Sequence, residues 1–267
     1  MGSLSERYGP WAVIAGGSEG VGVSFARKLA ADGINLVLVA RKPGPLIETA
    51  DAVRAEFGVE VRTLALDLTA PDAVEQVRAL TDGVEVGMLI YNAGTDNVAA
   101  DMLDRALAAA ERVIALNVLG QTRFVHHYGS AMQARGRGGI ILVGSLLAYA
   151  GGGGMTAYAA AKAFSHTLAK GLWYEMRPHG VDVLGLVLSA TKTPAAYRLG
   201  LKMDDPVIVA SEPDVVAQEG LDRLGKLPLW VVSDAADFAA HLKSLSDADA
   251  VELVSRSAQE MHGPKSQ

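Results

Sequence analysis

The chain has 267 residues, of which 50% are hydrophobic and 20% charged, a composition that allows a large core and excludes a disordered protein. Its formal net charge of -6 argues against nucleic acid or an anionic membrane as a partner, since both attract clustered Lys and Arg. The lack of cysteine excludes disulfides and thiolate metal sites. The sequence contains neither an apolar run long enough to span a membrane nor the pattern of a signal peptide, so we predict a cytoplasmic protein.

Short apolar runs alternate with longer segments of helical periodicity along most of the chain, a pattern typical of βαβ units around a parallel sheet. The predicted strands are nearly continuous in Val, Ile and Leu, as a sheet covered on both faces requires. They span residues 11–15, 35–40, 60–66, 87–91, 139–143, 181–188 and 228–232. The predicted helices span residues 20–32, 44–57, 71–80, 104–134, 156–178 and 212–224.

Capping residues support several of the predicted helix ends. Thr69 is expected to cap the helix that begins near Pro71, because a hydroxyl before a first-turn proline is a common start signal. Gly33, Gly58 and Gly180 follow helical runs, where a left-handed residue is favoured.

No internal repeat or linker divides the chain, so we predict a single doubly wound Rossmann-type α/β domain over residues 1–267. It has a seven-stranded parallel sheet flanked by helices, with a core over residues 10–232. Residues 233–267 are predicted to form a short helical tail, of which residues 262–267 are expected to fray.

A glycine-rich turn joins the first predicted strand to the first helix. Gly16, Gly20 and Gly22 form the spacing Gly-x3-Gly-x-Gly. Glycines let the backbone turn sharply and approach a pyrophosphate, and the N-terminus of the helix offers free N–H donors. The alternative is a tight turn that binds no ligand. We expect a dinucleotide to bind here, through Gly16, Ser18, Glu19, Gly20, Val21 and Gly22.

The end of the second strand indicates which dinucleotide is used. An enzyme that prefers NAD places Asp or Glu there for the ribose hydroxyl, whereas this chain has Ala40 followed by Arg41 and Lys42. Arg presents a planar fork of donors to a 2′-phosphate. We therefore predict NADP(H) as the cofactor. Alternatively, Arg41 and Lys42 only begin a solvated helix, and Glu19 is an unfavourable charge nearby.

Tyr158 and Lys162 lie four residues apart at the start of a predicted helix and therefore share one face. A nearby ammonium stabilises a phenolate, so we expect Lys162 to lower the pKa of Tyr158 from its ordinary value of about 10. Ser145, at the carboxyl end of the fifth strand, is placed to hydrogen-bond a substrate oxygen. Taken alone, such a pair or such a serine is usually an ordinary surface or packing feature.

Taken in chain order, these motifs resemble those of the short-chain dehydrogenase/reductase family, over about residues 10–232. The branch that contains hydroxysteroid and 3-ketoacyl reductases is the most similar. The resemblance rests on the glycine turn and on Asp67, Asn92-Ala93-Gly94, Asn117, Ser145, Tyr158 and Lys162.

The resemblance implies an NADP(H)-dependent oxidoreductase that interconverts a ketone or aldehyde and the corresponding alcohol. Tyr158 is then the general acid in reduction and the base in oxidation, and Ser145 positions and polarises the substrate oxygen. Lys162 also holds the nicotinamide ribose, and Asn117 holds a water that links Lys162 to solvent. The remaining residues border the adenine or line the cofactor, namely Asp67, Leu68, Asn92, Ala93 and Gly94.

The segment after the sixth strand departs from the family pattern Pro-Gly-x-x-x-Thr. Leu188 and Ser189 replace the Pro-Gly turn. Thr193 keeps the position expected to meet the nicotinamide carboxamide, and Thr191 is assigned to the same binding site.

Two segments are expected to enclose the substrate. Residues 147–156 form one wall, where four consecutive glycines imply a mobile backbone or the close approach of another segment. Residues 194–210 form a lid, and its apolar side chains favour a lipophilic substrate unless they pack on the sheet instead. These side chains are Tyr197, Leu199, Leu201, Met203, Val207, Ile208 and Val209.

Members of the family commonly pair through the two long helices, here residues 104–134 and 156–178, so a homodimer or homotetramer is expected. Small residues on the second helix permit close contact between copies, or packing on the sheet. They are Ala159, Ala160, Ala163 and Ala169.

Two other classes of function remain open. A non-catalytic NADP(H)-sensing regulator on the same fold typically lacks the Tyr or the Lys, both of which this chain retains. A hydrolase is disfavoured, because Ser145 lies in Val-Gly-Ser-Leu-Leu rather than Gly-x-Ser-x-Gly. His126 and His127 are adjacent and cannot share a helix face, so we expect no metal site.

Overall fold

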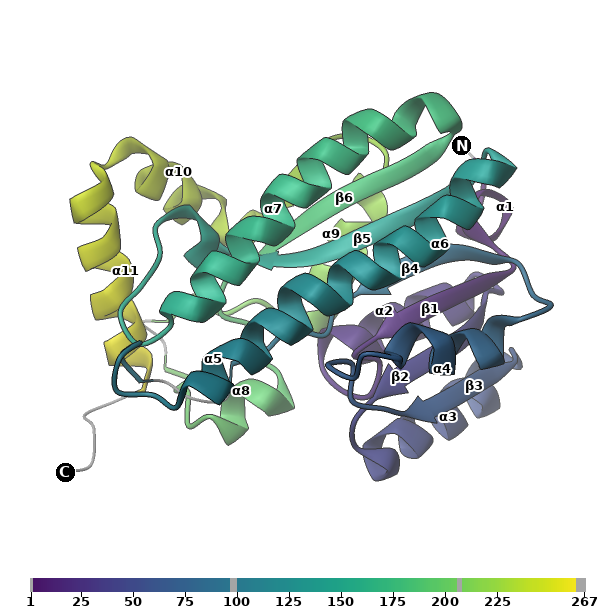
Figure 1. Cartoon of the computed structure of the whole chain (residues 1–267), viewed down its shortest axis with the longest axis horizontal. Helices are drawn as coiled ribbons and strands as arrows, with labels where there is room; N and C mark the ends of the chain where they lie inside the picture. Colours follow the sequence, from purple (N-terminus) through teal and green to yellow (C-terminus); the bar gives the residue numbers. More distant parts are fainter. Residues whose placement is uncertain (1, 97–99, 206–207, 263–267) are drawn as a thin grey trace.

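The computed structural model describes residues 2–96, 100–205 and 208–262. Within these residues, seven parallel strands form one sheet in the order β3-β2-β1-β4-β5-β6-β7 (Figure 1). Three strands have the predicted bounds, and the others differ by one or two residues at an end. The strands are β1 (Trp11–Ala15), β2 (Asn35–Ala40), β3 (Val61–Ala65), β4 (Val86–Tyr91), β5 (Gly138–Ser145), β6 (Val181–Leu188) and β7 (Leu229–Val231).

Helices cover both faces of the sheet, as the doubly wound prediction requires. Alternate strand residues point to opposite faces, so Ile14 belongs to the core layer that α2, α3 and α9 cover, whereas Val13 belongs to the layer that α4, α6 and α7 cover. The α-helices are α1 (Leu4–Tyr8), α2 (Val21–Ala31), α3 (Pro43–Phe57), α4 (Ala73–Thr81), α5 (Leu107–Ile114), α6 (Gln121–Arg135), α7 (Thr156–Met176), α8 (Pro194–Arg198), α9 (Pro213–Arg223), α10 (Ala236–Ser244) and α11 (Asp247–His262).

The long helix predicted over residues 104–134 is interrupted. It begins at Leu107 as α5, passes through a π-helical segment, Ala115–Gly120, and continues as α6. Tyr91 Oη donates a hydrogen bond of 2.7 Å to the Leu116 carbonyl within this segment. The side chain of a neighbouring strand therefore contacts the backbone at the point where the helix changes its hydrogen-bonding register.

One predicted helix cap is wrong. The helix after β3 begins at Ala73, with Asp72 rather than Thr69 at the N-cap position. The Thr69 hydroxyl donates to Asp67 over 2.9 Å instead. The three glycines expected after helices do adopt the left-handed region, at Gly33, Gly58 and Gly180.

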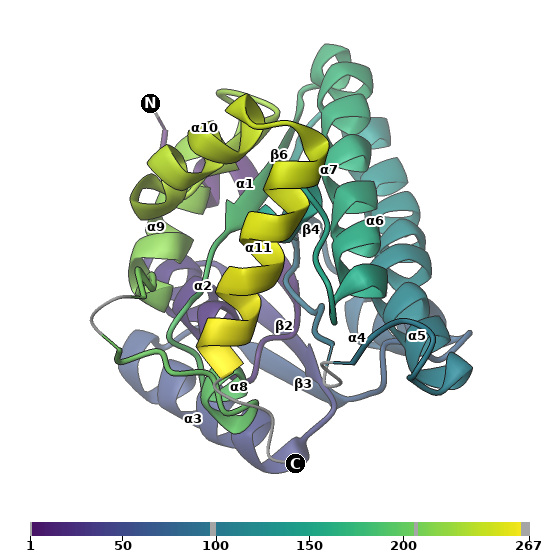
Figure 2. The same ribbon diagram turned by 90° about the vertical axis from the view of Figure 1, so that its left-hand side faces the viewer.

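The tail after β7 is more extensive than predicted, because α10 and α11 together reach His262. Figure 2 shows α11 running from α10 towards α8. Fraying is predicted for residues 262–267, but His262 is the last residue of α11, and residues 263–267 lie outside the described part of the chain. Within that part, no helix combines the length and the apolar character needed to cross a bilayer.

Candidate active site

The turn between β1 and α2 is built from glycines in positions that admit no side chain. Gly16 and Gly20 have φ values of 86° and 56°. A Cβ on Gly22 would lie 1.9 Å from the Gly16 carbonyl oxygen. That carbonyl accepts a hydrogen bond of 2.9 Å from the side-chain amide of Asn92, which therefore holds the turn against the end of β4.

This turn fits the phosphates of a dinucleotide. Among the described residues, no side chain caps the first turn of α2, so backbone N–H donors there are left for an anion. Val21 can contact a phosphate only through its backbone N–H, because its side chain is buried in the core. The side chains of Ser18 and Glu19 line a cavity of about 830 Å³ on the side of the turn that faces α8 and α9, and none of the candidate catalytic residues lines this cavity.

Gly94 lies where two candidate catalytic side chains converge. A Cβ on Gly94 would be 2.4 Å from Asn117 Oδ1 and 2.5 Å from Lys162 Nζ. Asn117 lies in the π-helical segment and donates through Nδ2 to the Val113 carbonyl over 3.0 Å. Its Oδ1 is buried and has no hydrogen-bond partner among the described residues. Asn117 Oδ1, an acceptor, and Lys162 Nζ, a donor, thus both lie next to Gly94. A water held between them could link Lys162 to solvent.

Lys162 lies in the second turn of α7 and is buried, with 2% of its surface exposed. Its Nζ donates a hydrogen bond of 2.8 Å to the Val143 carbonyl. Burial disfavours the charged ammonium and lowers the pKa of Lys162 to about 8.

The expected lowering of the Tyr158 pKa is wrong. Burial of the phenol group raises its pKa to about 12, although the interaction with Ser145 acts in the opposite direction and the charge of Asp96 adds to the increase. Lys162 Nζ lies 5.5 Å from the centre of the Tyr158 ring, so the ammonium faces the ring. Tyr158 is therefore protonated at neutral pH, as a general acid must be.

His166 lies one turn beyond Lys162 on α7 and was not anticipated. Its ring occupies the space that a side chain at Gly144 would need, since a Cβ there would lie 2.5 Å from His166 Nε2. Burial, followed by the nearby charges of Lys162, Lys170 and Lys243, lowers the pKa of His166 to about 4. The histidine is thus a neutral packing group behind the site.

The residues assigned to the adenine end have different surroundings. Asp67 accepts hydrogen bonds from Arg112 over 2.6 Å and from Thr69, and these hold its pKa below the ordinary value although partial burial acts against them. The Leu68 side chain is buried in the core, which leaves only its backbone near a ligand. Arg41 and Lys42 are exposed and form no ion pair within the described residues.

The two threonines predicted to bind the cofactor after β6 have different hydrogen bonds. Thr191 is buried, and its hydroxyl donates to the Ser189 carbonyl over 3.1 Å, so its side chain faces its own loop rather than a ligand. Thr193 caps α8 by accepting from the Ala196 N–H over 3.2 Å. Its Cγ2 would be 2.7 Å from a Cβ on Gly20, so Thr193 lies directly against the glycine turn.

In the glycine-rich wall, residues 147–156, Gly151 and Gly154 adopt positive φ values of 79° and 74°, and Gly152 and Gly153 lie against α11. A Cβ on Gly152 would lie 3.2 Å from Val254, and the Gly153 N–H donates to Ser255 Oγ over 2.9 Å. Close approach of another segment is therefore confirmed. The spacing of Ala250, Val254 and Ala258 in the tail, four residues apart, is the signal that predicts a helix with one apolar face there.

The predicted lid does not present one continuous apolar face. Met203 is buried, whereas Tyr197 and Val209 are 45% and 65% exposed, and Val207 lies outside the described residues. The Lys202 N–H donates to the Met261 carbonyl over 3.1 Å, so α11 contacts this segment as well as the glycine-rich wall.

A buried ion pair joins Asp96, which follows β4, to Arg105, which precedes α5. Arg105 donates to both oxygens of Asp96, over 2.7 and 2.9 Å, and at most 2% of either side chain is exposed. Neither residue belongs to a recognisable sequence motif, so the pair is not predictable from the sequence. The Asp96 charge lies close enough to Tyr158 to contribute to the increase in its pKa.

Comparisons with known proteins identify the family of the chain. The family model described as short chain dehydrogenase matches residues 10–203. A 7beta-hydroxysteroid dehydrogenase from Clostridium sardiniense is 34% identical over 84% of this chain and 85% of its own length. A solved structure reported for 7beta-hydroxysteroid dehydrogenase stereoselectivity has 28% identity and a TM-score of 0.88, covering 95% of this chain and 99% of the other.

A second solved structure is a short-chain dehydrogenase from Sphingobium yanoikuyae in complex with NADPH. It is 31% identical, has a TM-score of 0.76, and covers 90% of this chain and 97% of the other. The chain belongs to the short-chain dehydrogenase family and is an oxidoreductase that acts on CH–OH or C=O groups.

Proposed function

We propose that this enzyme uses NADP(H) to interconvert a lipophilic ketone or aldehyde and its alcohol. The observation that carries the proposal is the convergence of Ser145, Tyr158, Lys162 and Asn117 beside a turn that fits a dinucleotide. These groups come from β5, α7 and the π-helical segment, and meet at the carboxyl edge of the sheet, where open α/β folds bind ligands.

In this proposal the cofactor supplies or accepts the hydride, and side chains of the protein donate or accept the proton. Ser145 orients the substrate oxygen and Tyr158 donates a proton to it during reduction. The buried Lys162 ammonium returns a proton to the resulting phenolate, and Lys162 is reprotonated from solvent through a water that Asn117 Oδ1 would hold. In oxidation the steps run in reverse: Tyr158 first passes its proton towards Lys162, and the phenolate then accepts the proton of the substrate hydroxyl.

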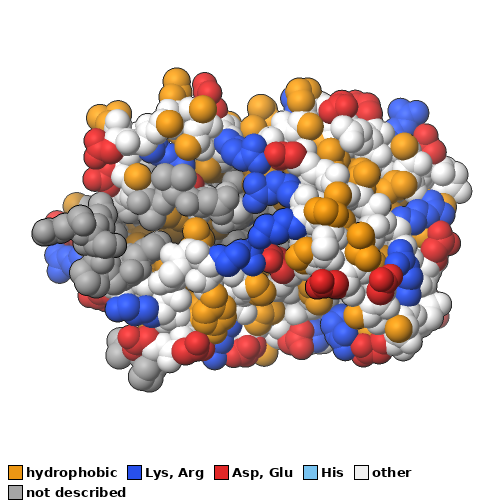
Figure 3. All heavy atoms as spheres, turned by 90° about the horizontal axis from the view of Figure 1, so that it is seen from below, with side chains coloured by type: hydrophobic (Ala, Val, Ile, Leu, Met, Phe, Trp, Pro, Cys, Tyr) orange, Lys and Arg blue, Asp and Glu red, His pale blue; other side chains and the backbone are white. Residues whose placement is uncertain are grey.

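The preference for NADP(H) is supported by exposed cations at the end of β2. Arg41 and Lys42 precede α3 and make no ion pair within the described residues, so both are free to contact a 2′-phosphate. Lys and Arg side chains also gather near the middle of the face shown in Figure 3. A relative of similar structure was solved with NADPH.

A lipophilic substrate is supported by the apolar side chains of the glycine-rich wall, residues 147–156, and of the helix that packs behind it. Leu147 and Ala150 pack with Leu253 and Val254 of α11. Such a wall favours apolar ligands, because contact with them removes apolar surface from water. Relatives named for a hydroxysteroid are consistent with this character.

We test the reaction with purified protein, NADPH or NADH, and a panel of steroid ketones, aromatic ketones and small polar ketones. We expect NADPH consumption with the first two groups and a higher kcat/KM for NADPH than for NADH. Replacement of Arg41 by Ala is expected to reduce that preference by about tenfold or more, because a charged hydrogen-bond partner of the 2′-phosphate is lost. Absence of a preference in the wild type contradicts the cofactor assignment, and a preference for polar ketones contradicts the substrate class.

Tyr158→Phe separates an enzyme from a cofactor sensor. The variant keeps the ring but lacks the proton, so it is expected to bind NADPH within about threefold of the wild type and to lose turnover. Binding without turnover in the wild type as well favours the non-catalytic regulator. Full turnover by the variant contradicts the role of Tyr158.

We also propose that two copies associate through α5 and α7. Leu107 and Ile114 on α5 are 68% and 45% exposed, and α5 packs directly beside α7. The outer face of α7 is hollowed between Phe164, Leu168 and Leu172. Ala159 and Ala169 are buried within the chain, so of the four alanines only Ala160 and Ala163 remain near this surface.

A further inference from the structure

The glycine turn proposed to bind the cofactor phosphates carries a negative charge of its own. Glu19 lies between Gly17 and Gly20, and 28% of its side chain is exposed. A carboxylate beside a diphosphate opposes binding, because like charges a few ångströms apart repel even when partly screened by water. A turn with this sequence needs a compensating cation.

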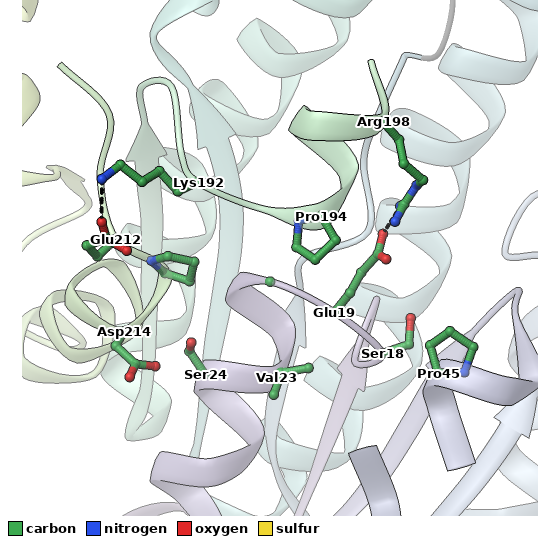
Figure 4. A pocket seen from close by; sticks show the side chains of 12 residues that line it. Ser18, Glu19, Val23, Ser24, Pro45, Lys192, Pro194, Arg198, Glu212 and Asp214 are labelled. Carbon is green, nitrogen blue, oxygen red and sulfur yellow. Dashed lines mark hydrogen bonds and ion pairs between the residues drawn. The ribbon is translucent and has the colours of Figure 1, made fainter. Parts of the chain in front are cut away.

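Arg198 supplies a cation at this position. Its Nη2 donates to Glu19 Oε1 in an ion pair that joins the glycine turn to α8. Figure 4 shows the two side chains pointing towards each other, with Ser18 beside them. The pair raises the pKa of Arg198. Thr193 packs on Gly20 at the other end of α8, so two contacts hold this helix on the turn.

Arg198 also keeps donors available for a second anion. The ion pair uses one of its five N–H groups, and the guanidinium is the group best suited to bind two oxyanions at once. The side chain is 48% exposed and lines the cavity of about 830 Å³ together with Ser18, Glu19 and Pro45. Lys192, the other cation of that cavity, is held by Glu212 over 2.7 Å.

We propose that Arg198 is a further cofactor-binding residue, which neutralises Glu19 and donates its remaining hydrogen bonds to the pyrophosphate of NADP(H). The inference rests on the proposed function. It assigns to α8 a role in cofactor affinity, in addition to the predicted role of residues 194–210 as a lid over the substrate.

The test measures the Kd of NADPH by fluorescence titration for the wild type, Arg198→Met, Glu19→Gln and the double variant. Arg198→Met leaves Glu19 uncompensated and is expected to raise the Kd by about tenfold. Glu19→Gln removes the repulsive charge, so its Kd is expected to equal that of the wild type or to fall up to about threefold. The double variant is expected to lie between these values. Arg256→Met, which removes an exposed arginine paired with Glu252 on α11, is the matched control and leaves the Kd unchanged.

The sign of the Glu19→Gln effect decides between charge compensation and a simple clamp. If the pair only held α8 in place, Glu19→Gln would weaken NADPH binding as much as Arg198→Met, and the proposal would be overturned. An Arg198→Met variant that binds NADPH as tightly as the wild type overturns this inference alone. A wild type that binds neither NADPH nor NADH overturns the proposed function, and this inference with it.

Discussion

A Cβ at position 94 would lie 2.5 Å from Lys162 Nζ, so the ammonium can lie beside the end of β4 only because residue 94 is glycine. The same Cβ would be 2.4 Å from Asn117 Oδ1. Both side chains are buried, with 2% and 1% of their surface exposed, and neither can move aside freely. One glycine thus sets the position of two candidate catalytic groups.

Replacing Gly94 with Ala is expected to lower kcat by about 100-fold, because displacement of reacting groups by about 1 Å has an effect of that order. Steady-state kinetics with NADPH and a ketone substrate give the measurement. Gly129→Ala is the matched control, since a Cβ there meets Ile140 at an ordinary 3.5 Å. It should retain activity and gain about 0.5–1 kcal/mol of stability as a helical glycine replaced by alanine. Equal kcat values for the wild type and Gly94→Ala would show that the position of Lys162 is not critical.

Lys162→Met is expected to stabilise the protein while abolishing turnover. Burial lowers the pKa of Lys162 from 10.5 to about 8, so at pH 7 the folded state contains an ammonium that it disfavours. Removing it should raise the free energy of unfolding at pH 7 by about 1–3 kcal/mol, after allowance for the lost hydrogen bond to Val143. The advantage should disappear as the pH rises from 8 to 10.5, where the folded wild type already holds a neutral amine.

Urea unfolding at pH 7 and pH 10 measures this difference. Lys162→Arg is the control, because its side chain stays charged at both pH values and should be less stable than Lys162→Met at each. A Lys162→Met protein less stable than the wild type at pH 7 would mean that the surroundings of Lys162 compensate its charge.

His166 is expected to make the fold sensitive to acid. Its pKa is lowered from 6.5 to about 4, so the folded state binds fewer protons than the unfolded state between these values, and stability is lost as the pH falls through them. Between pH 7 and pH 4.5 the wild type should lose about 2–3 kcal/mol more than His166→Leu. Chemical denaturation at both pH values checks this, and His179→Gln, an exposed histidine, should follow the wild type. Parallel losses in the wild type and His166→Leu would contradict the expectation.

The proposed association through α5 and α7 predicts that Ile114→Lys reduces the oligomer to a smaller species. A lysine at an apolar contact between copies would bury an unpaired charge, which such an interface does not tolerate. Light scattering coupled to size exclusion gives the mass. Val251→Lys, at a 40% exposed position on α11, should keep the mass of the wild type. A wild type that is already monomeric rules the association out.

The sequence predicts β1, β2 and β6 with their observed bounds, because each is a nearly continuous apolar run buried on both faces. Ser145, which ends β5, and Tyr158 and Lys162, in the first two turns of α7, lie at positions that the sequence pattern indicates. Asn117, in contrast, lies within the π-helical segment and is assigned from the family resemblance alone. The π-helical segment is not predictable in this way. It involves Tyr91, whose hydroxyl contacts Leu116 across 25 positions of sequence.

The pKa of Tyr158 illustrates the same limit. The spacing from Lys162 correctly predicts that the two side chains are neighbours, but the depth of burial depends on the whole surrounding fold and reverses the expected direction. Arg198 and Glu19 are 179 positions apart, and no local pattern links them.

The candidate proton-transfer groups and the helix behind the glycine-rich wall lie on separate stretches of chain. The candidate groups occur between Asn117 and Lys162, whereas the helix that contacts Gly152 and Gly153 begins at Asp247. Substitutions on the face of α11 that packs against this wall are therefore expected to shift the wall and to leave the candidate proton-transfer groups in place. Under the proposed function, in which the wall encloses the substrate, a lineage can change its substrate through this helix and retain the same reaction.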